Sequence, residues 1–114
     1  MPPANRDAFR TTLETERARL LGEVAEAIQA PDQMTYGSQA AAASQVFEQQ
    51  RDLALRERSS QHLEAVVAAL ARLDDGSYGT CVRCGRTIAP QRLEALPWAA
   101  HCIECRTILD RGGR

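Results

Sequence analysis

Residues 78–105 read YGTCVRCGRTIAPQRLEALPWAAHCIEC and contain all four cysteines of the chain. The cysteines form two C-x-x-C pairs with seventeen residues between the pairs. Two thiolates three positions apart converge when the backbone reverses, and two such pairs complete the tetrahedron that Zn²⁺ takes with four sulfurs. The spacing is typical of a zinc site, and the glycine that follows the first pair, Gly85, suits the positive φ that such a turn needs. The sequence therefore predicts one structural Zn²⁺ held by Cys81, Cys84, Cys102 and Cys105.

The sequence also allows these cysteines to form disulfides or a redox site. Two disulfides would require an oxidising compartment, and the first residues, MPPANRDAFRTT, contain no apolar signal segment. One pair could be a redox C-x-x-C, although two pairs at this spacing fit a shared metal better. A four-cysteine site leaves no coordination position for water, so we expect the zinc to hold structure. His101 adjoins Cys102 and is interpreted as a neighbour of the site, not a ligand.

The composition favours a small helical protein. A chain of 114 residues is too short for a large single core, so a metal usefully adds stability. Aromatic residues make up only 4%, which favours helices over sheet. The net charge of −1 gives no general attraction to nucleic acid or to an anionic membrane, and no apolar run approaches transmembrane length. We therefore expect a cytoplasmic protein with no membrane association.

Residues 1–76 are predicted to form a helical hairpin. The first helix is expected to start at an N-cap, Asn5, and to end before Pro31, and Ser38 suits the N-cap of a second helix that stops at Gly76. At 1.5 Å per residue the helices would be about 39 Å and about 55 Å long. Their apolar stripes are Phe9, Leu13, Leu20, Val24, Ala27 and Ile28, then Val46, Leu53, Leu63, Val67 and Leu70.

Packed against each other, these stripes predict an antiparallel two-stranded coiled coil with its tip at about residues 31–43. The alternative is that the hairpin buries its seam against a second chain. Residues 77–114 would form the four-cysteine zinc-finger module, with a short helix between Pro90 and Pro97 and a C-terminal helix from about Cys102. Trp98 is expected to pack on the base of the finger. The predicted fold class is all-α with a small zinc finger.

A long hairpin that leads directly into a C-x2-C-x17-C-x2-C finger resembles the DksA/TraR family of bacterial transcription factors. The resemblance is dense over residues 73–106 and rests on architecture across the hairpin. The matching residues are Asp75, Tyr78, Gly79, Cys81, Cys84, Gly85, Ile88, the string Arg92-Leu93-Glu94-Ala95 with Pro97, Cys102, Ile103 and Cys105.

The resemblance implies a regulator of transcription in the stringent response, and not an enzyme. It implies that the protein binds bacterial RNA polymerase and not DNA, that the hairpin enters the secondary channel with its tip near the catalytic centre, and that the alarmone ppGpp is a co-effector. No Ser/His/Asp set or phosphate-binding loop in the sequence points to catalysis.

The tip departs from the family. Counting back from Cys81 without gaps, the two aspartates and the alanine of the family's tip fall on Ser38, Ala41 and Ala43, so only the alanine matches. Asp32 is the one acid within the tip loop and could substitute if the loop is threaded differently. Met34 and Tyr36 favour a contact role because loops present such residues when they bind. These six residues are the predicted polymerase-contacting tip, altered and non-acidic.

The predicted alarmone contacts are also reduced. The basic residues that face ppGpp in the family map to Arg58, Gln61, Ala65 and Arg106, of which two are basic here. Phosphate recognition needs clustered donors, so we expect this chain to respond weakly or not at all to ppGpp.

A second hypothesis is an adaptor in which the finger binds a protein or nucleic acid and the hairpin is a spacer or dimer interface. Arginines around the finger give it some support: Arg83, Arg86, Arg92 and Arg106. The same arginines would also neutralise a tetrathiolate site. The near-neutral total charge weighs against strong duplex binding, so no direct sequence-specific DNA binding is expected.

Overall fold

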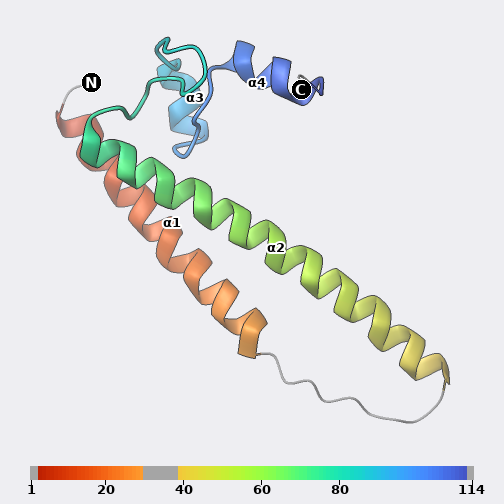
Figure 1. Ribbon diagram of the computed structural model, residues 1–114. Helices are drawn as coiled ribbons and strands as arrows, with labels where there is room; N and C mark the ends of the chain where they lie inside the picture. The colour runs from red at the N-terminus through yellow and green to blue at the C-terminus, as the bar shows by residue number, and fades with distance from the viewer. Residues whose placement is uncertain (1–2, 30–38, 113–114) are drawn as a thin grey trace.

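The computed structural model describes the backbone at residues 3–29 and 39–112, and side chains at residues 5–26 and 45–112. The described part contains α1 (Pro3–Gln29), α2 (Gln39–Asp75), α3 (Pro90–Ala95) and α4 (Ile103–Asp110). Its one element of β structure is an isolated antiparallel bridge between Thr80 and Thr87. Figure 1 shows α1 and α2 side by side as a long hairpin, with α3, α4 and their loops gathered at one end. The predicted fold class is confirmed.

The first helix begins earlier than the sequence suggested. α1 starts at Pro3, so the predicted N-cap, Asn5, lies inside the helix, and Asp7 falls beyond its first turn. Proline suits the first helical position because its fixed φ is already helical and its missing N–H is not needed there. At the other end, the described part of α1 reaches Gln29, two residues before Pro31, where the sequence predicted the helix to end.

The second helix ends where it was predicted to end. Gly76 follows Asp75 with a φ of 86°, and the N–H groups of Ser77 and Tyr78 both donate to the carbonyl oxygen of Arg72, at 3.0 and 3.1 Å. This is the Schellman arrangement, which satisfies the last helical carbonyls through a left-handed residue. The Asp75 carboxylate accepts hydrogen bonds from the backbone N–H and hydroxyl of Ser77, which lower the pKa of Asp75.

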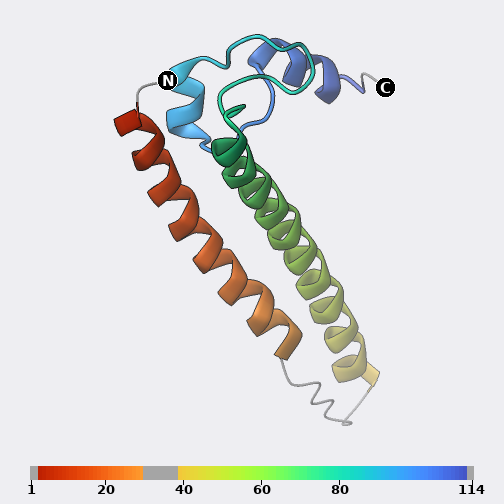
Figure 2. The same ribbon diagram turned by 60° about the vertical axis from the view of Figure 1, so that its left-hand side comes forward.

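Two side-chain contacts fix the antiparallel register of the hairpin. Arg10 pairs with Asp74 at 2.9 Å near the finger, and Ser59 donates to Glu23 at 3.3 Å farther out. The helical rise makes α1 about 40 Å and α2 about 55 Å long. The start of α2 therefore extends past the end of α1, as Figure 2 also shows.

The hydrophobic core of the hairpin lies in the half next to the finger. The buried residues are Leu13 and Leu20 on α1 and Val66, Ala69, Leu70 and Leu73 on α2, with Phe9 and Leu63 packed against them. Between Leu20 and the tip, the described side chains include none that is fully buried. The predicted stripe positions Leu13, Leu20 and Leu70 are confirmed as core, whereas Ala27 and Ile28 lie outside the described side chains.

Three predicted seam residues of α2 do not lie in the seam. Val67 is 46% exposed, whereas its neighbour Val66 is fully buried, because adjacent helical residues point about 100° apart around the helix. Val46 and Leu53 are each about half exposed. In their part of α2 the facing helix is ending, so little of α1 is present to cover them. The seam is therefore shorter than the heptad spacing suggested.

No described helix is long and apolar enough to cross a lipid bilayer.

Candidate metal centre

The first cysteine pair occupies a tight turn before α3. The Cys81 N–H donates to the Arg86 carbonyl at 2.8 Å, and the Gly85 N–H donates to the Cys81 carbonyl at 2.9 Å. Gly85 has a φ of 78°, as predicted, so the chain reverses there without the steric cost that a side chain would add. The Arg86 N–H then points to the Cys84 sulfur at 3.5 Å. The turn thus directs both sulfurs to one side.

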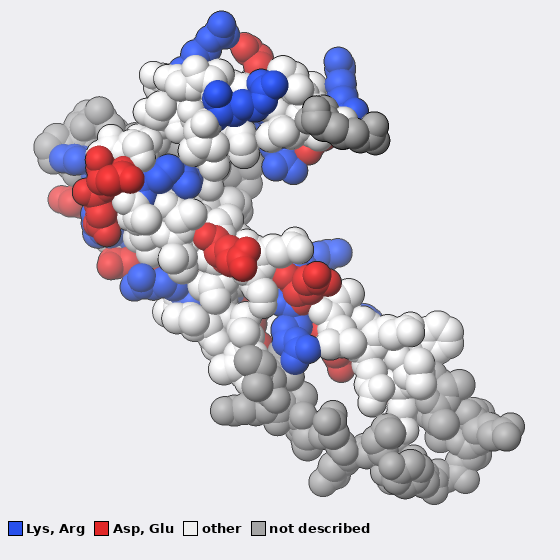
Figure 3. Space-filling view, viewed as in Figure 1, with Lys and Arg blue, Asp and Glu red and all other residues white. Residues whose placement is uncertain are grey.

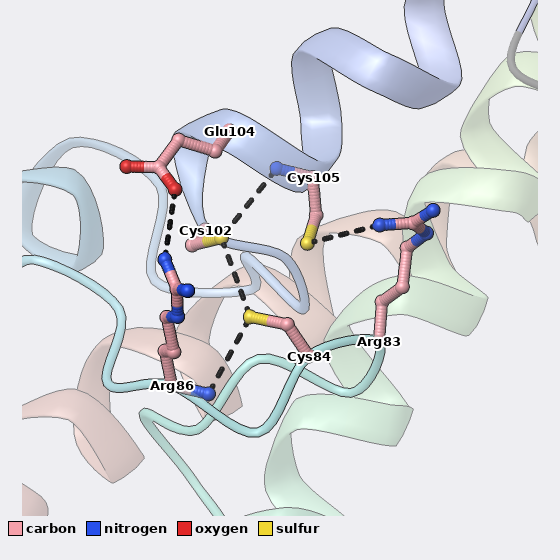
Figure 4. A network of polar contacts seen from close by, with 6 residues as sticks. All are labelled: Arg83, Cys84, Arg86, Cys102, Glu104 and Cys105. Carbon is pink, nitrogen blue, oxygen red and sulfur yellow. Dashed lines mark hydrogen bonds and ion pairs between the residues drawn. The ribbon is translucent and has the colours of Figure 1, made fainter.

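The second pair lies at the start of α4. Cys102 is the N-cap residue, and its sulfur accepts from the Cys105 N–H at 3.5 Å. The Val82 N–H donates to the Ala100 carbonyl at 2.9 Å. This bond holds the first turn against the segment that leads to Cys102. Figure 4 shows the two turns meeting, with Cys84 and Cys102 facing each other.

The four cysteine sulfurs form one cluster that fits a single tetrahedral metal ion. All four Sγ atoms lie within 4.8 Å of one another, and those of Cys84 and Cys102 are 3.7 Å apart. Four sulfurs at about 2.3 Å from a central zinc would be about 3.8 Å from one another. Cys81 and Cys105 are buried and Cys84 is exposed, so the cluster lies at the edge of the finger's core.

The electrostatics of the cluster favour a bound cation. Burial opposes ionisation of Cys81, but hydrogen bonds from backbone N–H groups outweigh it and lower the pKa of Cys81 to about 5. At Cys105 the Arg83 guanidinium favours the thiolate, but burial and the three neighbouring thiols together raise the pKa of Cys105 to about 11. One cysteine of the cluster therefore ionises readily, whereas ionisation of a further cysteine is unfavourable. A dication at the centre removes that penalty.

Of the four arginines near the finger, one contacts a ligand sulfur through its guanidinium. Arg83 donates to the Cys105 sulfur at 3.5 Å, whereas Arg86 pairs with Glu104 at 3.2 Å (Figure 4). Arg92 donates to the His101 carbonyl at 2.9 Å, and Arg106 pairs with Asp110 at 2.9 Å. His101 is outside the sulfur cluster, in agreement with its interpretation as a neighbour.

A joint between finger and hairpin, which the sequence did not reveal, positions the metal centre. The joint consists of Tyr78, the loop Pro97–Ala99, and Arg72 and His62 of α2. The Tyr78 hydroxyl donates to the Pro97 carbonyl at 2.7 Å, and Arg72 reaches the carbonyls of Trp98 and Ala99 at 3.5 and 3.4 Å. The Trp98 ring packs edge-on against His62, with centroids 4.3 Å apart. Trp98 thus packs where the base of the finger meets α2.

Of the predicted tip and alarmone residues, the structure describes the side chains of the alarmone residues alone. Asp32, Met34, Tyr36 and Ser38 fall outside the described residues, and Ala41 and Ala43 belong to α2 without described side chains. Arg58 is exposed on α2, and Arg106 is exposed on α4. Figure 3 shows the molecule hollowed between the finger with α4 and the adjoining stretch of α2.

Comparison with known proteins identifies this architecture. The family model described as the prokaryotic dksA/traR C4-type zinc finger matches residues 76–111. The RNA polymerase-binding transcription factor DksA of Haemophilus influenzae is 31% identical over 104 residues, which cover 90% of this chain and 72% of that protein. Its counterpart in Escherichia coli K12 is 30% identical over 104 residues, which cover 90% of this chain and 69% of that protein.

A solved structure agrees with the sequence relatives. Transcription factor DksA2 from Pseudomonas aeruginosa superposes with a TM-score of 0.76 at 33% identity, covering all of this chain and 89% of that one. The matched finger is of the C4 type, and the four sulfurs cluster at the spacing that zinc requires, so the protein has one structural zinc ion. The chain therefore belongs to the DksA/TraR family of C4 zinc-finger proteins.

Proposed function

We propose that this protein binds bacterial RNA polymerase and regulates transcription by inserting its hairpin into the secondary channel. The observation that carries the proposal is the shape of the molecule. It measures 60 × 32 × 20 Å, with the metal centre at one end and a narrow hairpin extending from it. A probe about 40 Å long, the length of α1, suits entry into a deep channel, and the finger provides a base that stays outside. The names of the H. influenzae and E. coli relatives support the same partner.

The exposed apolar residues of outer α2 support a contact role for this part of the hairpin. Phe47 is 74% exposed, and Val46, Leu53 and Leu55 are each about half exposed. Apolar side chains left uncovered in a soluble chain often mark a surface that a partner buries. In the proposed complex these residues lie inside the channel, just behind the tip.

The tip sets the direction of regulation. Ser38 and Ala41 stand at the two positions where the family has aspartates, so neither brings a carboxylate towards the catalytic centre. The protein is therefore expected to occupy the channel without the acidic contact, as a competitor of other channel-binding factors. We propose no enzymatic activity for it, because a four-sulfur site has no coordination position open for substrate.

The response to ppGpp is proposed to be weak. Arg106 already pairs with Asp110, which offsets part of its charge, and Arg58 makes no ion pair with any residue the structure describes. Gln61 and Ala65 supply no charge at all. With two of the four family positions uncharged and the charge of Arg106 partly offset, the chain provides few of the clustered donors that a polyphosphate needs.

Binding to purified RNA polymerase tests the proposal. The labelled protein should bind, and an excess of a transcript-cleavage factor, which occupies the same channel, should displace it. A Phe47→Asp variant should lose affinity, whereas Val67→Asp, also exposed on α2 but next to the finger, should lose less. Two outcomes would contradict insertion of the hairpin into the secondary channel. One is failure of the wild-type protein to bind polymerase, and the other is binding that the cleavage factor leaves unchanged.

Three further measurements test the finer parts of the proposal. The pair of substitutions Ser38→Asp and Ala41→Asp should increase inhibition of a ribosomal RNA promoter relative to wild type. Titration of the protein–polymerase complex with labelled ppGpp should reveal no protein-dependent site of micromolar affinity, and such a site would overturn the proposed weak response. In Figure 3 acidic and basic side chains alternate along the hairpin face, and a random duplex should accordingly not be retarded at low salt.

A further inference from the structure

A pocket of about 600 Å³ lies between the first turns of α1 and the finger, and neither the metal centre nor the tip uses it. Its floor is apolar: Tyr78, Ile88 and Leu93 are buried, and the ring of Phe9 lies 5.4 Å from that of Tyr78. Neither the four cysteines nor the two arginines assigned to ppGpp contribute to its lining. The pocket is therefore separate from the metal centre and from the two arginines assigned to ppGpp, and it shares Tyr78 and Pro97 with the joint between finger and hairpin.

The rim of the pocket is polar and negatively charged. The side chains of Asn5, Thr80, Thr87 and Glu94 line it and form no hydrogen bond or ion pair with any residue that the structure describes. Among the described lining residues Glu94 is the one that carries a charge, and none of them is an arginine that could neutralise it. The rim thus complements a positively charged group and opposes a carboxylate or phosphate.

The shape of the pocket favours a side chain of a protein partner over an enclosed small molecule. Its floor is buried, but its rim, including Ala8, Thr87 and Glu94, is exposed, so the pocket opens broadly to solvent. Small-molecule sites enclose most of their ligand, whereas protein interfaces insert single large anchors into such open apolar pockets. An aromatic or large aliphatic anchor would cover the Phe9–Tyr78 floor.

We propose that this pocket receives an aromatic or large aliphatic side chain of RNA polymerase, with an arginine or lysine of the same segment pairing with Glu94. The identity of the partner rests on the proposed function: with the hairpin inside the channel, the finger end and this pocket remain at the channel's outer edge. The pocket would then anchor the base of the molecule, while the tip acts at a distance.

Two variants test the anchor in binding to intact polymerase. Ala8→Trp places an indole in the pocket from an exposed helical position, and Glu94→Arg reverses the charge of the rim. Each should weaken binding about tenfold, the size typical of a lost interface anchor, and the loss from Glu94→Arg should shrink at high salt. The matched controls are Ala71→Trp and Glu14→Arg, exposed positions of the same types that do not line the pocket. They should bind within about twofold of wild type.

The same experiment separates the two proposals. If wild type fails to bind polymerase, the proposed function fails. If wild type binds and both pocket variants bind equally well, the anchor is excluded while the proposed function stands. Zinc content and circular dichroism of each variant show whether it has folded.

A probe experiment without polymerase tests the chemistry of the pocket. Phenylalanine amide is cationic and aromatic, and phenylacetate is its anionic counterpart. In NMR titrations of the zinc-loaded protein, phenylalanine amide should shift resonances of Tyr78 and Ile88 saturably, and Ala8→Trp should abolish those shifts. Equal shifts with phenylacetate, or no shifts with either probe, would overturn the proposal that this pocket binds an apolar side chain next to a positive charge.

Discussion

The hydroxyl of Tyr78 donates a buried hydrogen bond of 2.7 Å to the carbonyl oxygen of Pro97, nineteen residues further along the chain. Tyr78 follows the end of α2, and Pro97 follows α3, so this bond joins the hairpin's exit to the loop that leads to the second cysteine pair. The same ring lies against Phe9 of α1. One side chain therefore links the end of α2 to α1 and to the loop after α3.

Replacing Tyr78 with phenylalanine should destabilise the protein by about 1–2 kcal/mol, because the buried Pro97 carbonyl loses its donor while the ring packing is kept. Urea unfolding measures the change. Thr11→Val is the matched control, since it also removes a hydroxyl, but an exposed one that bonds within its own helix. Equal effects of the two substitutions would contradict a structural role for the Tyr78 hydrogen bond.

Tyr78 should also make stability fall at alkaline pH. Burial raises the pKa of Tyr78 to about 12, with the Arg72 charge offsetting part of the rise, whereas an unfolded tyrosine ionises near pH 10. Because the folded pKa is the higher one, its contribution is complete below about pH 10 and is lost as the pH rises through about 12. Unfolding free energies across this window should decline less steeply for Tyr78→Phe than for wild type. If the unfolding free energies of the two proteins changed in parallel with pH, the raised pKa of Tyr78 would be refuted.

Two adjacent valines of α2 should respond to truncation by very different amounts. Val66→Ala removes fully buried methyl groups and should cost about 2 kcal/mol of stability. Val67→Ala affects a side chain that is 46% exposed, and it should change stability by less than about 0.5 kcal/mol, since alanine also has the better helix propensity. Thermal unfolding of the pair decides the register: the reverse order of stability would place Val67 in the seam.

Removal of zinc should unfold the finger and leave much of the hairpin helical. Four thiols in one cluster cannot all ionise without the cation, so metal binding and folding of the finger are coupled. Trp98, the single tryptophan, lies in the joint, and its fluorescence should change on chelation while most helical circular dichroism persists.

Substitution of one ligand should have the same result as chelation. Cys84→Ser, although at an exposed position, should lose zinc as completely as Cys81→Ser at a buried one. Zinc content by mass spectrometry and Trp98 fluorescence are the two readouts. A metal-free protein with native Trp98 fluorescence would show that the finger folds on disulfides or packing alone.

Features with local causes were predictable from the sequence. Gly76 and Gly85 take the positive φ that was expected of them, and Pro90 begins α3, because each depends on a few neighbouring residues. The convergence of the four cysteines followed from their spacing alone. In the same way, Leu13, Leu20 and Leu70 are core residues because the helical spacing of the apolar residues places them on one face of each helix, and that face is buried.

Features that depend on distant partners were not predictable. Val66 and Val67 are both apolar and adjacent, and only the position of α1 decides which of them is buried. The start of α1 at Pro3 and not after Asn5 reflects competition between two acceptable helix starts. The bond between Tyr78 and Pro97 joins residues with no shared local pattern, so the joint and the nearby pocket emerged only from the fold.

Leu20 is the last buried side chain among those described in α1 (residues 5–26), and this position has a consequence for how the protein can diverge. None of the described α1 side chains beyond Leu20 is buried, so substitutions among them cost little stability and meet little selection for it. Substitutions in this outer part of the hairpin can therefore accumulate while the chain still folds around its zinc. Such changes leave an intact, metal-bound protein that can acquire a different role.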